Sequence, residues 1–187
     1  KLNKLGGING PKSTVTAGNA SGVNDGAAAL LLASKKGLET HGLKSIARIL
    51  GVAAAGVAPR IMGIGPVPAT RKVMAMTGLA IDDMDVIEIN EAFAAQVLGC
   101  LQLIKSDQFA KKELGRDKAI GSLELERLNV NGGAIALGHP VGVTGNRLIL
   151  TALKELHRRG DQHALVSLCI GGGQGGVLER QRGVWHH

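Results

Sequence analysis

The chain has 187 residues, of which 44% are hydrophobic and 20% charged, which excludes a disordered tail and allows one domain, or one domain with a piece of a neighbour. Two Phe, one Trp and no Tyr leave the core to be built from Ala, Val, Ile and Leu. The net charge of +7 suits an anionic ligand, but scattered basic residues and so few aromatic rings speak against a nucleic-acid-binding protein.

The two cysteines, Cys100 and Cys169, exclude a disulfide scaffold and a structural zinc site of the four-ligand kind. The histidines lack metal-ligand spacing among themselves, so we expect no bound metal. A reducing, cytoplasm-like compartment is expected. No apolar run is long enough to span a membrane, and the first residues have no signal-peptide pattern.

The first part of the chain alternates loops, strands and a helix. Residues 1–13 are polar and Gly-rich and are expected to form a loop. The apolar run 27–33 fits a helix or a strand, and its length and the polar residues after it favour a buried strand. A short helix should follow and end near Gly42. Residues 45–56 suit a second strand.

The middle of the chain carries two further helices around a short strand. A helix is predicted over 68–77 and is ended by Gly78. Residues 86–89 form the strand, and 91–105 form the next helix. The charged and weakly patterned segment 106–126 is interpreted as a surface excursion.

The last part begins with a Gly-rich segment, 129–146. Apolar residues at helical spacing predict a helix over 144–159. A strand over 164–170, a Gly-rich turn over 171–176 and a partner strand over 176–180 would complete a hairpin. Together these elements predict a layered α/β fold with a mixed sheet.

Asn90 follows the strand 86–89 and precedes the next helix. One interpretation is a helix N-cap, which is a favoured role for Asn and the commoner one. The other is that its side-chain amide orients a water or a substrate carbonyl. Both remain open from the sequence.

His139 lies between Gly138 and Pro140. A residue before Pro is pushed toward extended backbone, so the histidine is held in a defined direction. Small residues on both sides leave room for a ligand, and a helix beginning near Thr144 would favour an anion there. A structural or surface histidine is an equal alternative.

Cys169 lies near the end of a strand and is followed by Ile170 and the glycines 171–173. A buried cysteine is most often a small apolar residue. Here, however, backbone N–H groups of the glycines could approach a reacting oxygen, as an oxyanion hole requires. A thiol, an imidazole and such a hole suit acyl transfer at a thioester. A phosphate loop is disfavoured because the Gly-Lys-Ser/Thr ending is absent.

Residues 16–22 combine glycine with small polar residues. This composition fits any loop. It also fits the lining of a narrow tunnel for a long, thin ligand.

Five segments resemble the motifs of the thiolases, a family of acetyl-CoA acetyltransferases and 3-ketoacyl-CoA thiolases. One such motif would be weak evidence, but five in the family's order are specific. The segments are residues 17–28, 57–66, 90–93, 138–145 and 169–173.

The resemblance implies a longer protein with two similar halves, each with a βαβαβαββ core of helices around a mixed sheet. Residues 1–42 would be the end of the N-terminal thiolase domain, with a CoA-side loop and the last strand and helix. Residues 43–183 would be the C-terminal domain, and 184–187 a candidate tag remnant. The family's acylated cysteine lies in the other half, so the chain alone is expected to be inactive.

The resemblance also implies roles for individual residues. His139 would activate the acylated thiol and bind the thioester oxygen, and Asn90 would hold a water in the same oxyanion hole. Cys169 would be the second acid/base, and the backbone N–H of Gly171 would join a second oxyanion hole. Further positions would line the pantetheine arm and the acyl end of the pocket: Ala17, Ala20 and Ser21 for the arm, and Met62 and Phe93 for the acyl end.

The implied substrates are CoA and acyl-CoA thioesters, with no tightly bound cofactor. The intact protein is expected to be a cytoplasmic homo-oligomer that includes the N-terminal half. Residues 57–68 resemble degradative thiolases, including those that cleave 3-oxoadipyl-CoA, but do not separate them from acetoacetyl-CoA enzymes. A non-catalytic acyl-CoA or lipid-binding module is an alternative, disfavoured by the presence of Asn90, His139 and Cys169. A ketoacyl-synthase relative is disfavoured by the Cys-Ile-Gly element at 169–171.

Overall fold

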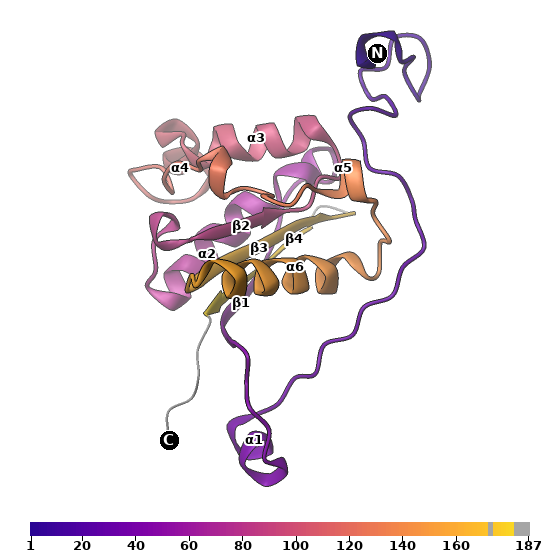
Figure 1. Cartoon of the computed structure of the whole chain (residues 1–187). Helices are drawn as coiled ribbons and strands as arrows, with labels where there is room; N and C mark the ends of the chain where they lie inside the picture. The colour runs from indigo at the N-terminus through magenta and orange to yellow at the C-terminus, as the bar shows by residue number, and fades with distance from the viewer. Residues whose placement is uncertain (172–173, 182–187) are drawn as a thin grey trace.

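The computed structural model describes residues 1–171 and 174–181 (Figure 1). Its centre is a four-stranded sheet in the order β1-β4-β3-β2, in which β2 and β3 are parallel and the other pairs antiparallel. The predicted α/β fold with a mixed sheet is therefore confirmed. The elements are α1 (Lys35–His41), β1 (Arg48–Gly56), α2 (Pro66–Thr77), β2 (Val86–Ile89), α3 (Ala94–Ile104), α4 (Asp107–Glu113), α5 (Ala134–Leu137), α6 (Thr144–Arg159), β3 (His163–Ile170) and β4 (Gln174–Gln181).

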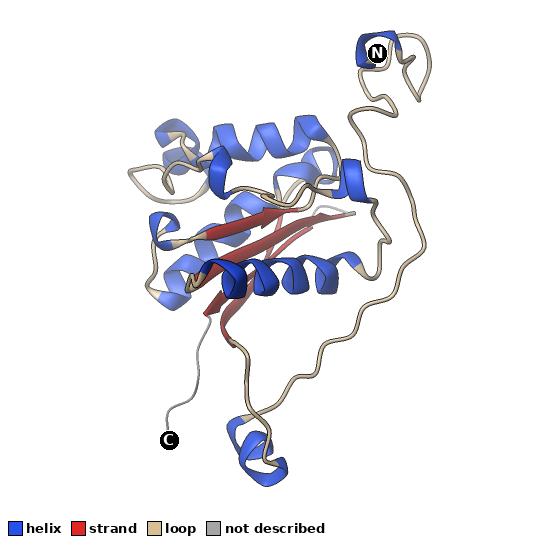
Figure 2. Cartoon of the chain, viewed as in Figure 1, coloured by secondary structure: helices blue, strands red, loops and turns tan. Residues whose placement is uncertain are grey.

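Helices cover both faces of the sheet, and the strand residues alternate between two cores (Figure 2). Ile87, Ile89 and Leu165 point to the face packed by α2, α3 and α4. Val86 and Val166 point to the opposite face, under α6. This period of two is what a strand buried on both faces produces.

The amphipathic helix α6 runs along the second face of the sheet and is the best predicted element. Leu148, Ala152 and Leu156 recur every four residues and are buried against β2 and β3. Burial of each leucine contributes about 2 kcal/mol. Gly160, with φ +81°, ends the helix.

The expected pattern of one thiolase half has five strands, and the described sheet has four. Beside β2, where a fifth strand would pair, the chain makes one isolated parallel bridge between Ile87 and Leu128. The next residue, Asn129, donates its backbone N–H to Ile87 and then turns away with φ +46°. The fifth strand is therefore reduced to a single bridge.

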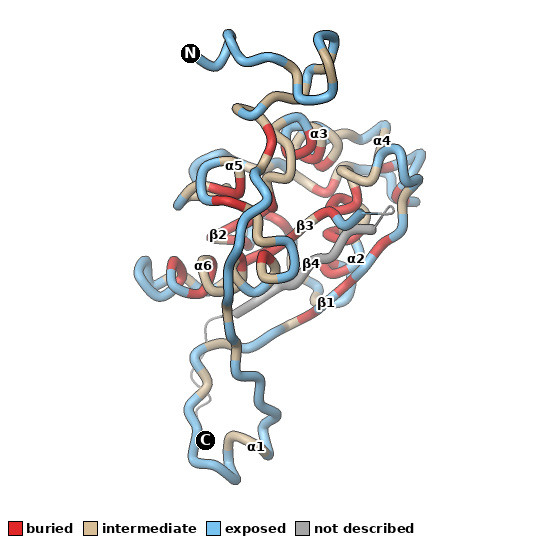
Figure 3. The backbone as a smooth tube through the Cα atoms, turned by 90° about the vertical axis from the view of Figure 1, so that its right-hand side faces the viewer, coloured by how far each residue is buried: buried red, intermediate tan, exposed pale blue. Residues whose placement is uncertain are grey.

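The prediction of a strand over 27–33 is wrong. The segment leading to α1 is an extended and mostly exposed part of the chain (Figure 3), with Leu31 82% and Leu32 73% exposed. A strand needs a neighbour to satisfy its N–H and C=O groups. None of the described strands lies beside this segment. The short helix predicted after it is confirmed as α1, capped by Gly42.

The segment 106–126 is only partly the predicted surface excursion. Ser106 caps the added helix α4 by accepting a hydrogen bond from the Phe109 N–H. Ala110, Leu114 and Ile120 are buried against the α2–α3 core. These apolar residues are spread too widely among charges to give a clear pattern in sequence.

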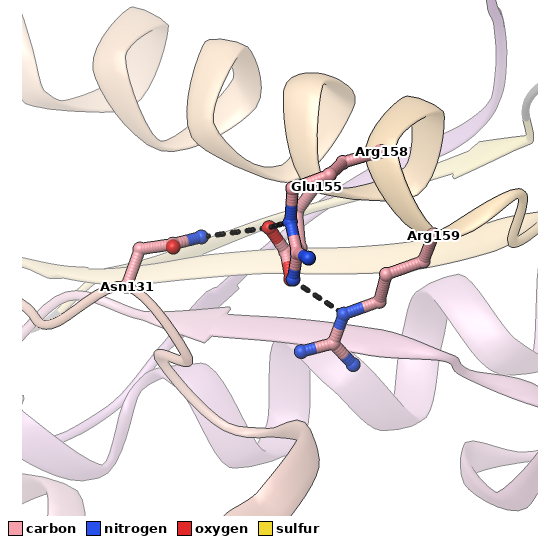
Figure 4. A network of polar contacts seen from close by, with 4 residues as sticks. All are labelled: Asn131, Glu155, Arg158 and Arg159. Atoms are coloured by element: carbon pink, nitrogen blue, oxygen red, sulfur yellow. Dashed lines mark hydrogen bonds and ion pairs between the residues drawn. The ribbon is translucent and has the colours of Figure 1, made fainter.

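A polar network ties the end of α6 to the loop before α5 (Figure 4). Glu155 is buried, accepts a hydrogen bond from Asn131 at 3.1 Å and pairs with Arg158 and Arg159. The hydrogen bond from Arg158, with those from Asn131 and Arg159, holds the pKa of Glu155 at about 2.

Among the described residues, no helix is long and apolar enough to cross a membrane.

Candidate functional site

The site begins at the carboxyl ends of the two parallel strands. Asn90 directly follows β2, and its backbone N–H donates to the Ser167 carbonyl of β3 at 2.9 Å. Cys169 lies near the end of β3. Because parallel neighbours end at the same edge, Asn90 and Cys169 lie at one end of the sheet. The short helix α5 and the loop into α6 lie at this end (Figure 1).

The Asn90 side chain is not a helix cap. Helix α3 begins at Ala94, three residues later than predicted, and Phe93 occupies its N-cap position without a side-chain hydrogen bond. The Asn90 amide is 1% exposed, and neither of its polar atoms has a hydrogen-bond partner among the described residues. A buried amide without partners costs about 1–3 kcal/mol. Such a group is more typical of a site than of a scaffold.

A clamp of hydrogen bonds holds the loop that carries His139. The Asn129 side chain accepts from the Ile89 N–H and donates to the Ile89 carbonyl, both at 2.9 Å, and so replaces a strand at this edge. It also donates to Glu91 at 3.1 Å. The other oxygen of Glu91 accepts from the Ile135 N–H at 3.2 Å. The residue beside Asn90 therefore anchors α5, which immediately precedes the His139 loop.

His139 is held from its backbone and from its ring. Its N–H donates to Asn24 at 3.1 Å, and its Nδ1 lies 2.7 Å from Thr144 Oγ1. The buried Thr144 hydroxyl donates to the Pro140 carbonyl at 3.3 Å, so it accepts from Nδ1–H. This assignment leaves the lone pair on Nε2.

The imidazole is also kept neutral. Burial, followed by the positive charge of Arg147, holds the pKa of His139 below its usual value. A neutral ring with an open Nε2 can accept a proton from a thiol.

The two cysteines have different surroundings. Cys100 is fully buried on α3, where its thiol donates to the Gly63 carbonyl at 3.3 Å, and burial raises its pKa to about 12. Its predicted core position is confirmed. Cys169 is 9% exposed at the strand end, and burial raises its pKa as well. Cys169 is therefore a protonated thiol in the resting site, suited to donate a proton.

Gly171 forms the turn after β3, two residues beyond Cys169. Among the described residues, no atom lies within 4 Å of a Cβ placed at this position, so the backbone is accessible from their side. The predicted glycines 172 and 173 lie outside the described residues. The role of the Gly171 N–H in an oxyanion hole stays a prediction.

The predicted substrate loop lies beside the start of α3. Ala20 forms an antiparallel bridge with Phe93, and the Ser21 N–H donates to the Ala92 carbonyl at 3.0 Å. Ala17 is exposed on the turn three residues before Ala20. Met62 is half-buried.

Met62 lies in a 3₁₀ segment, Pro59–Ile64, that packs against α3. Gly63 of this segment contacts the Gln96 side chain and accepts the Cys100 hydrogen bond. The structure therefore brings the Met62 segment close to α3, the helix that begins just after Phe93. The pantetheine and acyl-end roles of these residues stay predictions.

Sequence reasoning missed four polar residues around the site. Glu91 and Asn129 form the clamp, Glu88 is buried on β2, and Arg147 on α6 has buried guanidinium nitrogens. Glu91 lies within the motif 90–93, whereas the other three residues lie in none of the five motif segments.

No cluster of three His, Cys, Asp or Glu able to hold a metal occurs in residues 1–171 and 174–181.

Comparison with known proteins gives a consistent result. The family model described as "Thiolase, C-terminal domain" matches residues 43–180, and "Thiolase, N-terminal domain" matches residues 1–36. A beta-ketoadipyl-CoA thiolase of Pseudomonas aeruginosa is 56% identical over 97% of this chain and 41% of its own length. A 3-oxoadipyl-CoA/3-oxo-5,6-dehydrosuberyl-CoA thiolase of Escherichia coli is 53% identical over 96% of this chain and 42% of its length.

Solved structures agree with these relatives. The Bacillus anthracis acetyl-CoA acetyltransferase has a TM-score of 0.83 at 42% identity, covering 96% of this chain and 41% of that one. Human mitochondrial 3-ketoacyl-CoA thiolase in complex with CoA has a TM-score of 0.80 at 39% identity, covering 97% and 42%. This chain thus spans about two fifths of the length of the relatives it matches.

Proposed function

The chain belongs to the thiolase family, and on this premise we propose that it is the C-terminal part of a CoA-dependent thiolase. The intact enzyme would cleave a 3-oxoacyl-CoA with CoA, or condense two acyl-CoA molecules in reverse. The proposal rests chiefly on the positions of Asn90 and Cys169 at the same end of the sheet. His139 lies on the loop after α5, which Glu91 anchors next to Asn90.

The first half of the reaction would use a cysteine thiol supplied by the N-terminal half. His139 would take the proton of that thiol on Nε2, and the thiolate would attack the 3-oxo carbon. The bond between this carbon and the α-carbon would break, leaving an acyl-cysteine and an acetyl-CoA enolate. The Cys169 thiol would protonate the α-carbon, which releases acetyl-CoA and leaves a Cys169 thiolate.

The second half would reverse the proton movements. The Cys169 thiolate would take the thiol proton of CoA, and the CoA thiolate would attack the acyl-cysteine. The cysteine would leave and recover its proton from His139. Asn90 with a bound water and the Gly171 N–H would stabilise the negative oxygens that form in each half.

The proposed substrate is a CoA thioester of a 3-oxo acid, with 3-oxoadipyl-CoA first among the candidates. Support comes from the names of relatives that are 53–56% identical. An acetyl-CoA acetyltransferase of Chromobacterium violaceum, 52% identical over 90% of this chain, keeps acetoacetyl-CoA as the second candidate. We further propose a reducing, cytoplasmic location and a homo-oligomeric intact enzyme; the free thiols of Cys100 and Cys169 support the former.

The test uses a reconstituted enzyme, made by mixing this chain with a separately produced N-terminal thiolase half. CoA-dependent cleavage is measured with 3-oxoadipyl-CoA and with acetoacetyl-CoA. We expect a higher kcat/KM for 3-oxoadipyl-CoA. A preference for acetoacetyl-CoA would contradict the substrate assignment, and binding of both thioesters without cleavage would favour the non-catalytic module.

A further inference from the structure

An exposed arm, residues 23–28, runs along the loop that carries His139 (Figure 3). Val23 forms an isolated parallel bridge with His139, and the side-chain oxygen of Asn24 accepts the His139 backbone N–H at 3.1 Å. Asn24 lies in the part of the chain that matches the N-terminal thiolase domain, whereas His139 lies in the part that matches the C-terminal domain. This hydrogen bond therefore joins the two domains at the candidate site.

A glycine on each side allows the arm and the loop to come close. Gly138 has φ +102°, and a Cβ there would lie 2.6 Å from Asn24 Oδ1. A Cβ at Gly26 would lie 2.8 Å from Cγ of Pro140. Both distances are shorter than a non-bonded contact allows, so a larger residue at either glycine would push the arm and the loop apart.

The arm contributes nothing to the hydrophobic cores. None of the residues 21–34 is buried. Its second hydrogen bond also goes to the segment after His139, because the Asn146 side chain donates to the Ala28 carbonyl at 3.5 Å. Among the described residues, the hydrogen bonds of the arm are thus made to the His139 loop and the start of α6 rather than to core elements.

We propose that Asn24 is a positioning residue that fixes the backbone of His139 for proton transfer. The imidazole is then held from two directions, by Thr144 at the ring and by Asn24 at the backbone. The second hold is needed because the residue before the histidine is a glycine, which leaves the backbone free to rotate. Since a general base must stay within hydrogen-bond reach of its proton, a displaced Nε2 lowers the catalytic rate more than substrate binding.

The hold on the backbone is measured by hydrogen exchange of the His139 amide in the 187-residue chain, followed by NMR. Asn24→Leu keeps the side-chain size and removes the acceptor, so exchange should become about fivefold faster. Asn24→Asp keeps an oxygen at the same position and should exchange no faster than the parent. Asp25→Leu is the matched control on the same arm. The Asp25 side chain makes no hydrogen bond or ion pair within residues 1–171 and 174–181, so this variant should exchange like the parent.

A second variant tests the same hold without changing the Asn24 side chain. In Gly26→Ala the added methyl meets Pro140, so the arm moves away and exchange at His139 should also become faster. Because the arm buries no side chain, the urea midpoint of each variant should equal that of the parent. Parent-like exchange in Asn24→Leu, or an equal increase in Asp25→Leu, would overturn the proposal. A lower urea midpoint with parent-like exchange would show a purely structural role and would overturn it as well.

The catalytic consequence is measured in the reconstituted enzyme, with an N-terminal half that ends before the part matched by this chain, so that this chain supplies the arm. Asn24→Leu should lower kcat about tenfold and change KM less than about twofold. Asn24→Asp should retain most of the kcat when each variant is compared at the pH of its maximal rate, since a carboxylate near the imidazole favours the imidazolium. Equal kcat values in Asn24→Leu and Asp25→Leu, or a change confined to KM, would contradict the positioning role.

The catalytic meaning of this inference rests on the proposed function, and the two readouts separate them. Faster exchange in Asn24→Leu together with an inactive parent enzyme would count against the thiolase proposal alone. An active parent enzyme whose Asn24→Leu variant keeps both the exchange rate and the kcat would count against the role of Asn24 alone.

Discussion

The Glu91 carboxylate occupies the space in which a Cβ at Gly133 would stand. This contact explains why a glycine precedes α5: the backbone must come close enough for the Ile135 N–H to reach the Glu91 oxygen at 3.2 Å. The clamp joins positions 38 to 44 residues apart in sequence. It fixes the His139 loop against the residue next to Asn90.

Gly133→Ala should destabilise the chain by about 2 kcal/mol, because the added methyl collides with a carboxylate that is itself held by Asn129. Urea unfolding measures this change. Gly145→Ala is the matched control, since a Cβ there meets no atom within 4 Å and lies in the first turn of α6. The control should be neutral or stabilising. Equal stabilities of the two variants would contradict the clamp.

Thr144→Val should reduce the kcat of the reconstituted enzyme about tenfold, because the Nδ1–H of His139 loses its acceptor. Thr and Val have similar shapes, but Val also removes the hydrogen bond to the Pro140 carbonyl, so urea unfolding of the variant is measured alongside its kcat. Thr144→Ser retains the hydroxyl and should keep most of the activity. The account of His139 orientation would be wrong if the Val and Ser variants had the same kcat.

Removing the thiol of Cys169 should lower the kcat of the reconstituted enzyme, whereas removing that of Cys100 should lower only the stability of the chain. Cys169→Ala should lower the kcat of the reconstituted enzyme by at least about a hundredfold, as expected for loss of a general acid/base. Cys100→Ala should keep the kcat and lower the unfolding free energy by about 1 kcal/mol, because it leaves a small cavity in the α3 core and removes the hydrogen bond to the Gly63 carbonyl. A large loss of activity in Cys100→Ala would contradict the assignment of Cys100 as a core residue and of Cys169 as the acid/base.

The pH dependence of stability should report Glu88. Below pH 4.5 the carboxyl is protonated in both folded and unfolded chains. Between pH 4.5 and about 7 only the unfolded chain releases the proton, so the folded state loses stability as pH rises, and the loss levels off above about 7.

Glu88→Gln removes this titration, so its stability relative to the parent should rise across the same pH window. Thermal unfolding at a series of pH values measures the difference. Glu126→Gln, at an exposed position, should run parallel to the parent. A constant difference between Glu88→Gln and the parent would show that the carboxyl titrates normally.

Local patterns predicted much of the fold. Strand β2 has the expected bounds, and the apolar spacing of α6 gave its full length. The run 27–33 misled because seven apolar residues suggest burial, whereas burial depends on a neighbouring strand that the described chain lacks. The segment 106–126 misled in the opposite direction, since its few apolar residues reach the core across long gaps.

The candidate site also contains residues that the sequence identified and residues that it did not. His139, Cys169 and Asn90 could be named because each has an unusual position beside Pro, Gly or a strand end. The capping interpretation of Asn90 failed because α3 begins only at Ala94, so that Phe93 occupies the N-cap position. Asn129 could not be found, since its importance comes from Ile89 and Glu91, which lie 40 and 38 residues earlier in the sequence and are brought near it only by the fold.

The most direct test of the account is CoA-dependent thiolysis by the 187-residue chain alone, compared with the same chain mixed with an N-terminal thiolase half. We predict no cleavage of 3-oxoadipyl-CoA or acetoacetyl-CoA by the chain alone and clear activity on mixing. Mixing with a His139→Ala chain should not restore activity. Cleavage by the chain alone would contradict the account, because Cys169 or Cys100 would then have to carry the acyl group.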